Sequence, residues 1–324
     1  MPDSHRGKEI YLFFGIYGIN GIVGIIISQI IIGIIVYKTL KISKESNIEN
    51  YANFSKHINK TRKIREITKK IIDIFLLLSF YVMIAGFSAY FSQELGIPSI
   101  IGTITIIALC YITFIGDIEG IIKVNTILIP ILIIFIIILA TKNINAFERI
   151  NNKITQSNFL KSIYSAIIYS SYNSITLIPI VITIKKYVKN NKQIKLVSIL
   201  VIITLIVLAI SIYILTLKVD IDINKLELPT VYVAGMSGKI YKLIYGVIIL
   251  VAIFTSSISA GYSILENYID NPKKYKKMVI LICASGILVS KIGFSTLINI
   301  LYPIFGLLGI IQIAYILINP TKTY

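Results

Sequence analysis

Long apolar segments alternate with short polar ones along almost the whole of the 324-residue chain. An α-helix needs about 20 predominantly apolar residues to cross a bilayer, and most of these segments come near or exceed that length. The pattern predicts an all-α polytopic membrane protein. We expect apolar helices at about 10–37, 71–92, 98–115, 121–140, 160–184, 194–217, 240–265, 277–292 and 294–318.

The first apolar segment is too long for a single helix. Glycine recurs in it at every third position, at Gly15, Gly18, Gly21 and Gly24. We predict a short helix at about 7–17, a turn near Gly18–Gly21 and a full span that ends at about Tyr37. With the later segments this gives about nine full spans and one half-helix. Small residues at this spacing also let neighbouring helices approach closely.

Basic residues concentrate in particular loops. The chain has 32 Lys and Arg against 15 Asp and Glu, and ten of the basic residues lie in 38–70, five in 185–195 and four in 273–277. Loops rich in Lys and Arg stay in the cytoplasm. If the nine spans alternate, all three loops and the C-terminus lie on that side. We therefore attribute the net charge of +17 to topology and contact with membrane lipid, not to binding of nucleic acid.

The sequence carries no pattern typical of an enzyme or a metalloprotein. Cys110 and Cys283 lie in different apolar segments, and His5 and His57 lie outside the spans without metal-ligand spacing. Motifs of the forms HExxH and GxSxG, and phosphate-binding loops, do not occur in it. We expect a protein that is not an enzyme and needs no cofactor.

A run of polar residues interrupts the apolar segment 160–184 at its middle. This polar patch comprises Tyr169, Ser170, Ser171, Tyr172, Asn173 and Ser174. In a continuous helix these side chains would face in all directions, and unpaired polar groups are costly in hydrocarbon. One interpretation is a helix that breaks here and lines a cavity enclosed by protein. The alternative is a continuous helix whose hydroxyls bond to carbonyls one turn earlier, with Tyr and Asn packed against other helices.

A second group of hydroxyl residues lies deep in the segment 240–265. It comprises Thr255, Ser256, Ser257 and Ser259, and Ala252 precedes Thr255 by one turn. Hydroxyl oxygens beside a small residue suit a dehydrated monovalent cation, a hard ion that prefers oxygen ligands. The alternative is that these small side chains serve only to pack helices closely.

Six stretches together resemble the YkvI-like family of bacterial membrane proteins, which belongs to the amino acid–polyamine–organocation superfamily with the LeuT-type fold. The resemblance runs essentially from end to end of the chain. The stretches are GKEIYLFFGIYG (7–18), MIAGFSAYFSQELGIPSIIG (83–102), GIIKVNTILIPIL (120–132), AIIYSSYN (166–173), AIFTSSISAGY (252–262) and GFSTLINILYPIFGLLG (293–309).

The resemblance implies ten helices in two inverted five-helix repeats. The first repeat would occupy 1–140 and the second 160–324, with an extracellular linker at 141–159. The segment 160–184 would then be helix six, with its unwound centre at the polar patch. The segment 240–265 would be helix eight.

The resemblance also implies a sodium site on helix eight. In sodium-coupled members this helix supplies an alanine carbonyl and a Thr–Ser hydroxyl pair to one ion, and Ala252, Thr255 and Ser256 have that spacing. Proton-coupled relatives place a lysine from helix five at this site. The run that follows Asn125 is apolar, which favours sodium over a proton.

The start of the chain departs from the family pattern. Family members have an outgoing half-helix and a glycine-rich break before the position of Gly7, and this half-helix gives backbone carbonyls to the same sodium ion. Here the residues MPDSHR stand in its place. We therefore expect half of the cation ligands to be absent from this sequence.

The resemblance implies a secondary transporter in the bacterial cytoplasmic membrane. It would move a small, amino-acid-like solute by alternating access, as helices one, two, six and seven rock against the rest. The substrate would contact Tyr169, Ser170, Ser171, Tyr172 and Asn173, and also Gly7, Glu9 and Ser88. A carboxylate at membrane depth, such as Glu9, is a functional hypothesis by default. For Ser88, ordinary packing is the alternative.

A protein of a different class is also consistent with the sequence. A membrane sensor or receptor subunit with the same scaffold would bind its ligand without transporting it, and the departure at the N-terminus favours this reading. A third reading is a truncated, inactive transporter. The hydroxyls of Thr255 and Ser256 favour transport.

Overall fold

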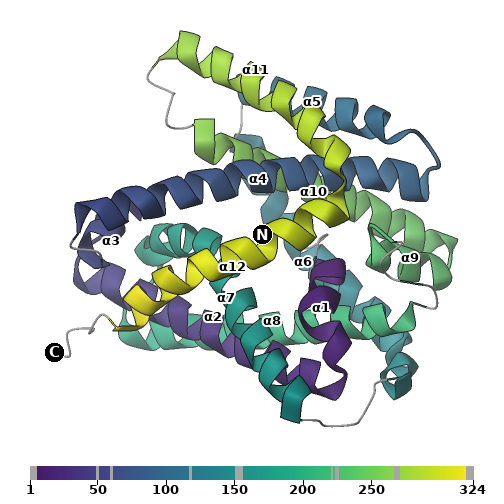
Figure 1. The fold of residues 1–324 in the computed structure, drawn as a ribbon, viewed down its shortest axis with the longest axis horizontal. Coiled ribbons are helices and arrows are strands. Elements are labelled where there is room, and N and C mark those ends of the chain that lie inside the picture. The colour runs from purple at the N-terminus through teal and green to yellow at the C-terminus, as the bar shows by residue number, and fades with distance from the viewer. Residues whose placement is uncertain are drawn as a thin grey trace. The chain divides into compact units, whose positions relative to one another are not determined.

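A computed structural model describes residues 6–48, 51–58, 61–116, 119–149, 156–219, 222, 226–265 and 271–318 (Figure 1). These residues form helices and no strand, which confirms the all-α class. The α-helices are α1 (Arg6–Phe14), α2 (Ile19–Glu45), α3 (Tyr51–Ile58), α4 (Arg62–Glu94), α5 (Ser99–Ile115), α6 (Glu119–Lys142), α7 (Gln156–Ile184), α8 (Asn191–Lys218), α9 (Pro229–Met236), α10 (Lys239–Leu265), α11 (Pro272–Val289) and α12 (Phe294–Ile318).

Six of the described helices are long and apolar enough to cross a membrane. They lie in α2, α4, α7, α8, α10 and α12. α5 and the Ile127–Lys142 part of α6 are apolar but shorter. α11 begins with four lysines within its first six residues. The first expected apolar segment is divided between α1 and α2, and each of the others falls mainly in one α-helix. The count of nine full spans stays a prediction.

The predicted break between the first two helices is confirmed. α1 passes into a short 3-10 helix, η2 (Gly15–Tyr17), and α2 begins two residues later. Between them Gly18 has a φ of 56°, a conformation that side chains with a Cβ rarely adopt. The amide of Gly21 then donates to the carbonyl of Gly18 at 2.9 Å, which starts the new helix.

The chain divides into two compact units, which interleave along the sequence. Unit 1 contains Met1–Gly15, Phe75–Ile150 and Ser211–Ile300, and unit 2 contains Ile16–Ile74, Asn151–Ile210 and Leu301–Tyr324. α4, α8 and α12 contribute to both units. The predicted repeats divide the chain into two consecutive halves, which is a different division, so they stay a prediction.

In unit 2, α2 packs along α7 (Figure 1). Small residues on both helices make this close approach possible: Gly21, Gly24 and Ser28 are buried on α2, and Ser162 and Ser165 on α7. The Ser162 hydroxyl donates to the carbonyl of Asn20 at 2.6 Å. A Cβ added at Gly33 would overlap the side chain of Ile202 on α8, so glycine is needed there too.

In unit 1, α10 packs against α4, α5, α6, α9 and α11. Its glycines receive aromatic side chains: a Cβ at Gly246 would overlap the Tyr90 hydroxyl, and one at Gly261 would overlap the ring of Phe114. α11 lies beside α5 in the same unit (Figure 1). Glycine thus sets the helix spacing in both units.

Candidate functional site

The polar patch lies in an unbroken helix. α7 is helical from Gln156 to Ile184, so the predicted break at 169–174 is wrong. The patch bonds to its own helix instead: the hydroxyls of Ser170 and Ser171 donate to the carbonyl of Ile167 at 3.0 and 2.6 Å, and Ser174 donates to Ser170 at 2.6 Å. The Asn173 amide donates to the carbonyl of Tyr169 at 2.9 Å. Local bonding satisfies these groups without unwinding the helix.

The patch packs against the second half of α12, within unit 2. A Cβ added at Gly309 would overlap the backbone carbonyl of Ser171, and one at Gly306 would overlap Ile168. The ring of Tyr172 stacks on Tyr302, with centroids 4.8 Å apart and an interplanar angle of 19°. This is the packing that the alternative interpretation expected of the tyrosines.

Burial within the patch is nearly complete. The side chains of Ser170, Ser171 and Ser174 are fully buried, and Tyr169 and Tyr172 are each 4% exposed. Tyr169 meets Tyr172 edge to face, with centroids 5.4 Å apart. Asn173 is half-buried. Asn173 is therefore the patch side chain that a small molecule reaches with the least rearrangement.

The second group of hydroxyl residues lies on α10, where three oxygen atoms lie within about one helical turn. Thr255 and Ser256 both donate to the carbonyl of Ala252, at 3.1 and 2.7 Å. Thr255 is 2% exposed and Ala252 7%. Ser257 faces elsewhere and lies 3.2 Å from the Cys110 sulfur on α5. The residues Ala252, Thr255 and Ser256 thus form a compact oxygen cluster inside an apolar helix.

The other predicted substrate residues have mixed outcomes. The Ser88 hydroxyl donates to the carbonyl of Ser99 at 2.7 Å and accepts from Thr103 at 3.0 Å, so it clamps α4 to α5. Glu9 lies on α1 and is 5% exposed. Gly7 lies at the start of α1, and its burial is outside the described part of the structure. Their role at a substrate stays a prediction.

Comparison with known proteins finds similarity to a bacterial membrane protein. The uncharacterized membrane protein YkvI of Bacillus subtilis (strain 168) is 28% identical over 255 residues, which cover 76% of this chain and 73% of the relative. The predicted resemblance to YkvI-like membrane proteins is confirmed. No family model matches the chain.

A polar network in unit 1 was not expected from the sequence. The side-chain oxygen of Gln93, at the end of α4, accepts from the backbone amides of Glu227 and Leu228 at 2.6 and 3.0 Å. The Glu227 carboxylate in turn accepts from the amide of Ser295 at 2.9 Å and from its hydroxyl. Three segments distant in sequence are thereby joined, one of them the entry to α9.

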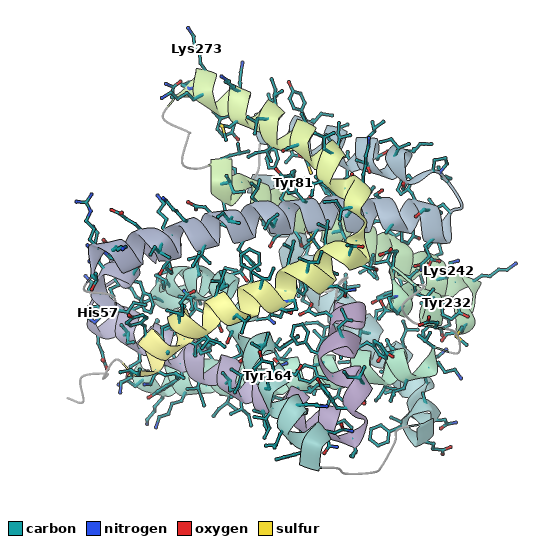
Figure 2. The ribbon with its side chains drawn as sticks, in the orientation of Figure 1. His57, Tyr81, Tyr164, Tyr232, Lys242 and Lys273 are labelled. Carbon is teal, nitrogen blue, oxygen red and sulfur yellow. The ribbon has the colours of Figure 1, made fainter. Side chains whose placement is uncertain are left out.

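An ion pair adjoins this network. The Lys242 ammonium lies 2.8 Å from the Glu94 carboxylate, whose side chain is only 4% exposed, and Gln93 also donates to Glu94 (Figure 2 labels Lys242). In the sequence, Gln93 and Glu94 directly follow the apolar segment 71–92, and Lys242 lies at the start of the segment 240–265. The hydropathy pattern does not pair them, because they are far apart along the chain.

Proposed function

We propose that this chain is a secondary transporter that moves a small, amino-acid-like solute by alternating access and is coupled to sodium. The observation that carries the proposal is the oxygen cluster of Ala252, Thr255 and Ser256. Hydroxyl oxygens keep lone pairs after donating a hydrogen bond, so rotation of the two hydroxyls directs three oxygens at one ion. An enclosed group of oxygens in an apolar helix is the environment that a hard, dehydrated cation needs.

The division into two units supports alternating access. Unit 2 holds α2, α7 and most of α8, which are three of the four predicted rocking elements, whereas α1 belongs to unit 1. The other unit holds α5, α10 and α11 and the second part of α4. A bundle that is compact in itself is what a rigid-body motion requires.

We assign the basic loops and the C-terminus to the cytoplasm of a bacterial cell. Contacts within unit 2 bring the loops 38–70 and 185–195 and the end of α12 together. Lys38 donates to the carbonyl of Leu317 near the C-terminus, and Lys44 donates to the carbonyl of Val188 at 3.3 Å. Lys185 donates to Asn47 at 3.1 Å. Two lysine-rich loops and the end of α12 therefore meet, as the positive-inside pattern predicts.

We assign the substrate to the polar patch on α7. Asn173 offers an amide, and Tyr169 and Tyr172 offer phenol groups, the chemistry that suits the charged and polar ends of an amino acid. The hydroxyls of Ser170 and Ser171 already donate within the helix, but each oxygen keeps lone pairs that can accept from a substrate. Gly7, Glu9 and Ser88, which belong to unit 1, stay predicted substrate residues from the sequence alone.

A non-transporting sensor or receptor subunit is the second candidate. The continuity of α7 favours it, because an intact helix with its hydroxyls bonded to the backbone needs no ligand to complete it. The two candidates differ in one property. A sensor binds its ligand without concentrating it, whereas a coupled transporter accumulates solute against a gradient.

Sodium binding tests the cation site directly. Sodium at ten times its dissociation constant should stabilise the purified protein by about 1.4 kcal/mol relative to choline, because the ion binds only the folded state. The double variant Thr255→Ala, Ser256→Ala should lose this stabilisation. Ser263→Ala is the matched control, since its hydroxyl is exposed and bonds to the carbonyl of Ser259 on the same helix. Equal stabilisation of both variants would exclude the proposed cluster.

A further inference from the structure

An open depression of about 380 Å³ lies on the surface of unit 2, where α2 ends and α3 begins. Among the described residues it is lined by Ser46, Asn47, Ile48, Asn53, Lys56 and His57. Figure 2 labels His57 at this corner. The chain turns here because Asn47 has a φ of 49°, and the amide of Ile48 then donates to the carbonyl of Ser43 at 2.8 Å.

The hydrogen-bond donors of this depression are side chains. The backbone amides of Ser46, Asn47 and Ile48 already donate to carbonyls of α2. The Ser46 hydroxyl lies 3.3 Å from Nε2 of His57, which holds the imidazole beside the depression. Lys56, which is exposed, adds an ammonium group. A hydroxyl, an imidazole and an ammonium from two helices thus surround one polar space.

Further positive charge is fixed at the rim. The Lys185 ammonium donates to the side chain of Asn47 at 3.1 Å, and Lys44 is held by the carbonyl of Val188. The neighbouring carboxylate of Glu45 lies 3.8 Å from the ammonium of Lys41 and so is already paired. Among the described residues of this corner, Lys44, Lys56 and Lys185 therefore outnumber the carboxylates.

Ile48, which lines the depression, also belongs to a buried apolar cluster under α3. Phe54 and Ile58 of α3 are buried with Ile42, Ile178 and Ile316 from the ends of α2, α7 and α12. The short helix α3 therefore covers the ends of membrane-spanning helices with its apolar face and exposes its polar one. In a bilayer this is the level of the lipid headgroups.

We propose that this depression binds a phosphate group, which the membrane supplies as the headgroup of an anionic phospholipid. Phosphate accepts several hydrogen bonds from different directions, and lysine is a common point-charge partner for it. A choline headgroup carries its own cation and would be repelled by the lysines. Basic residues next to a membrane-spanning helix attract anionic lipid, and here they also form a site of defined shape. The site does not depend on the proposed transport activity.

Thermal unfolding of the full chain in detergent tests this site. Cys110 and Cys283 are buried, so a thiol-reactive dye reports unfolding. Phosphatidylglycerol added to the micelles should raise Tm saturably, and phosphatidylcholine should not. Lys56→Gln should weaken the apparent affinity for phosphatidylglycerol about tenfold, the effect of losing one charge-assisted hydrogen bond. Lys185→Gln should also weaken the apparent affinity for phosphatidylglycerol.

The matched control is Lys63→Gln, which removes the same charge from an exposed position on α4 and should leave the affinity within about twofold. Equal weakening by Lys63→Gln and Lys56→Gln would show unspecific attraction and overturn the site. An equal response to both lipids would also overturn it. A further experiment compares Tm in inorganic phosphate with Tm in chloride at equal ionic strength. If inorganic phosphate raises Tm in a Lys56-dependent way and phosphatidylglycerol does not, the assignment to lipid is overturned.

Discussion

Single glycines decide how closely the polar patch approaches its neighbouring helix. At Gly309 the nearest atoms are the backbone of Ser171, which cannot move aside without distorting α7. At Gly235 the nearest atoms belong to the flexible side chain of Lys242, with Cδ 3.3 Å from an added Cβ. The two positions therefore differ in what a methyl group would meet, although both are helical glycines.

The variant Gly309→Ala should lower the free energy of unfolding by about 1–3 kcal/mol, because overpacking forces the backbone of α7 away from α12. Gly235→Ala should change stability by less than about 1 kcal/mol, since the lysine side chain can shift. Thermal unfolding, monitored through the labelling of the buried cysteines as they become exposed, measures the stability of both variants. Equal stability of the two variants would contradict the close packing of the patch.

Tyr51 gives a residue-scale prediction for alkaline conditions. Burial raises the pKa of the Tyr51 phenol above its ordinary value, and Gln312 donates to its oxygen at 3.2 Å. A raised folded-state pKa means that the contribution of Tyr51 to stability is complete below about pH 10 and declines above it. Between about pH 9 and about pH 11, wild type should lose more stability than Tyr51→Phe. Parallel curves for the two proteins would refute this role.

The apolar pattern predicted the long helices well. Their positions follow from the places where a run of apolar residues is long enough to cross the hydrocarbon of a bilayer, and the hydropathy pattern alone shows these places. α3 and α9 were missed because each is only eight residues long and lies between polar or mixed segments. The continuity of α7 was open, because serine supports either a broken helix or one with hydroxyls bonded to its own carbonyls. Only the hydrogen bonds decide between the two.

The entry to α9 depends on a side chain from another helix. Leu228 precedes α9, and its side chain makes no cap; the oxygen of Gln93 accepts from the amides of Glu227 and Leu228 instead. Such a long-range cap is invisible in sequence, because the partners are 134 and 135 residues apart. Helix ends that need partners often obtain them from distant segments.

Gln93→Leu should leave these two amides without an acceptor, at a cost of about 1–3 kcal/mol for each buried group. Amide hydrogen exchange should then accelerate at Glu227, at Leu228 and in the first turn of α9. Ser92→Ala is the control, since the Ser92 hydroxyl donates to the carbonyl of Ala89 within α4. Unchanged exchange in Gln93→Leu would show that the cap contributes nothing to α9.

At the scale of the whole molecule, the two units were not visible in the hydropathy pattern. Apolar periodicity reports which residues avoid water, and lipid-facing and protein-facing positions look alike in it. Membership in a unit depends on small residues that fit one particular neighbour, such as Gly33 against Ile202 in unit 2 and Gly246 against Tyr90 in unit 1. The resemblance to YkvI-like proteins implied a bundle of helices one, two, six and seven, and unit 2 contains three of these four but not α1.

Solute accumulation in proteoliposomes tests the central proposal most directly. The full chain is reconstituted, an inward sodium gradient is imposed, and uptake is measured for a labelled mixture of amino acids. We expect the solute to accumulate above its external concentration, and we expect this accumulation to stop when choline replaces sodium. Thr255→Ala with Ser256→Ala should abolish it, and Ser263→Ala should retain it. Ligand binding without sodium-driven accumulation in the wild-type protein would contradict transport and favour the non-transporting receptor.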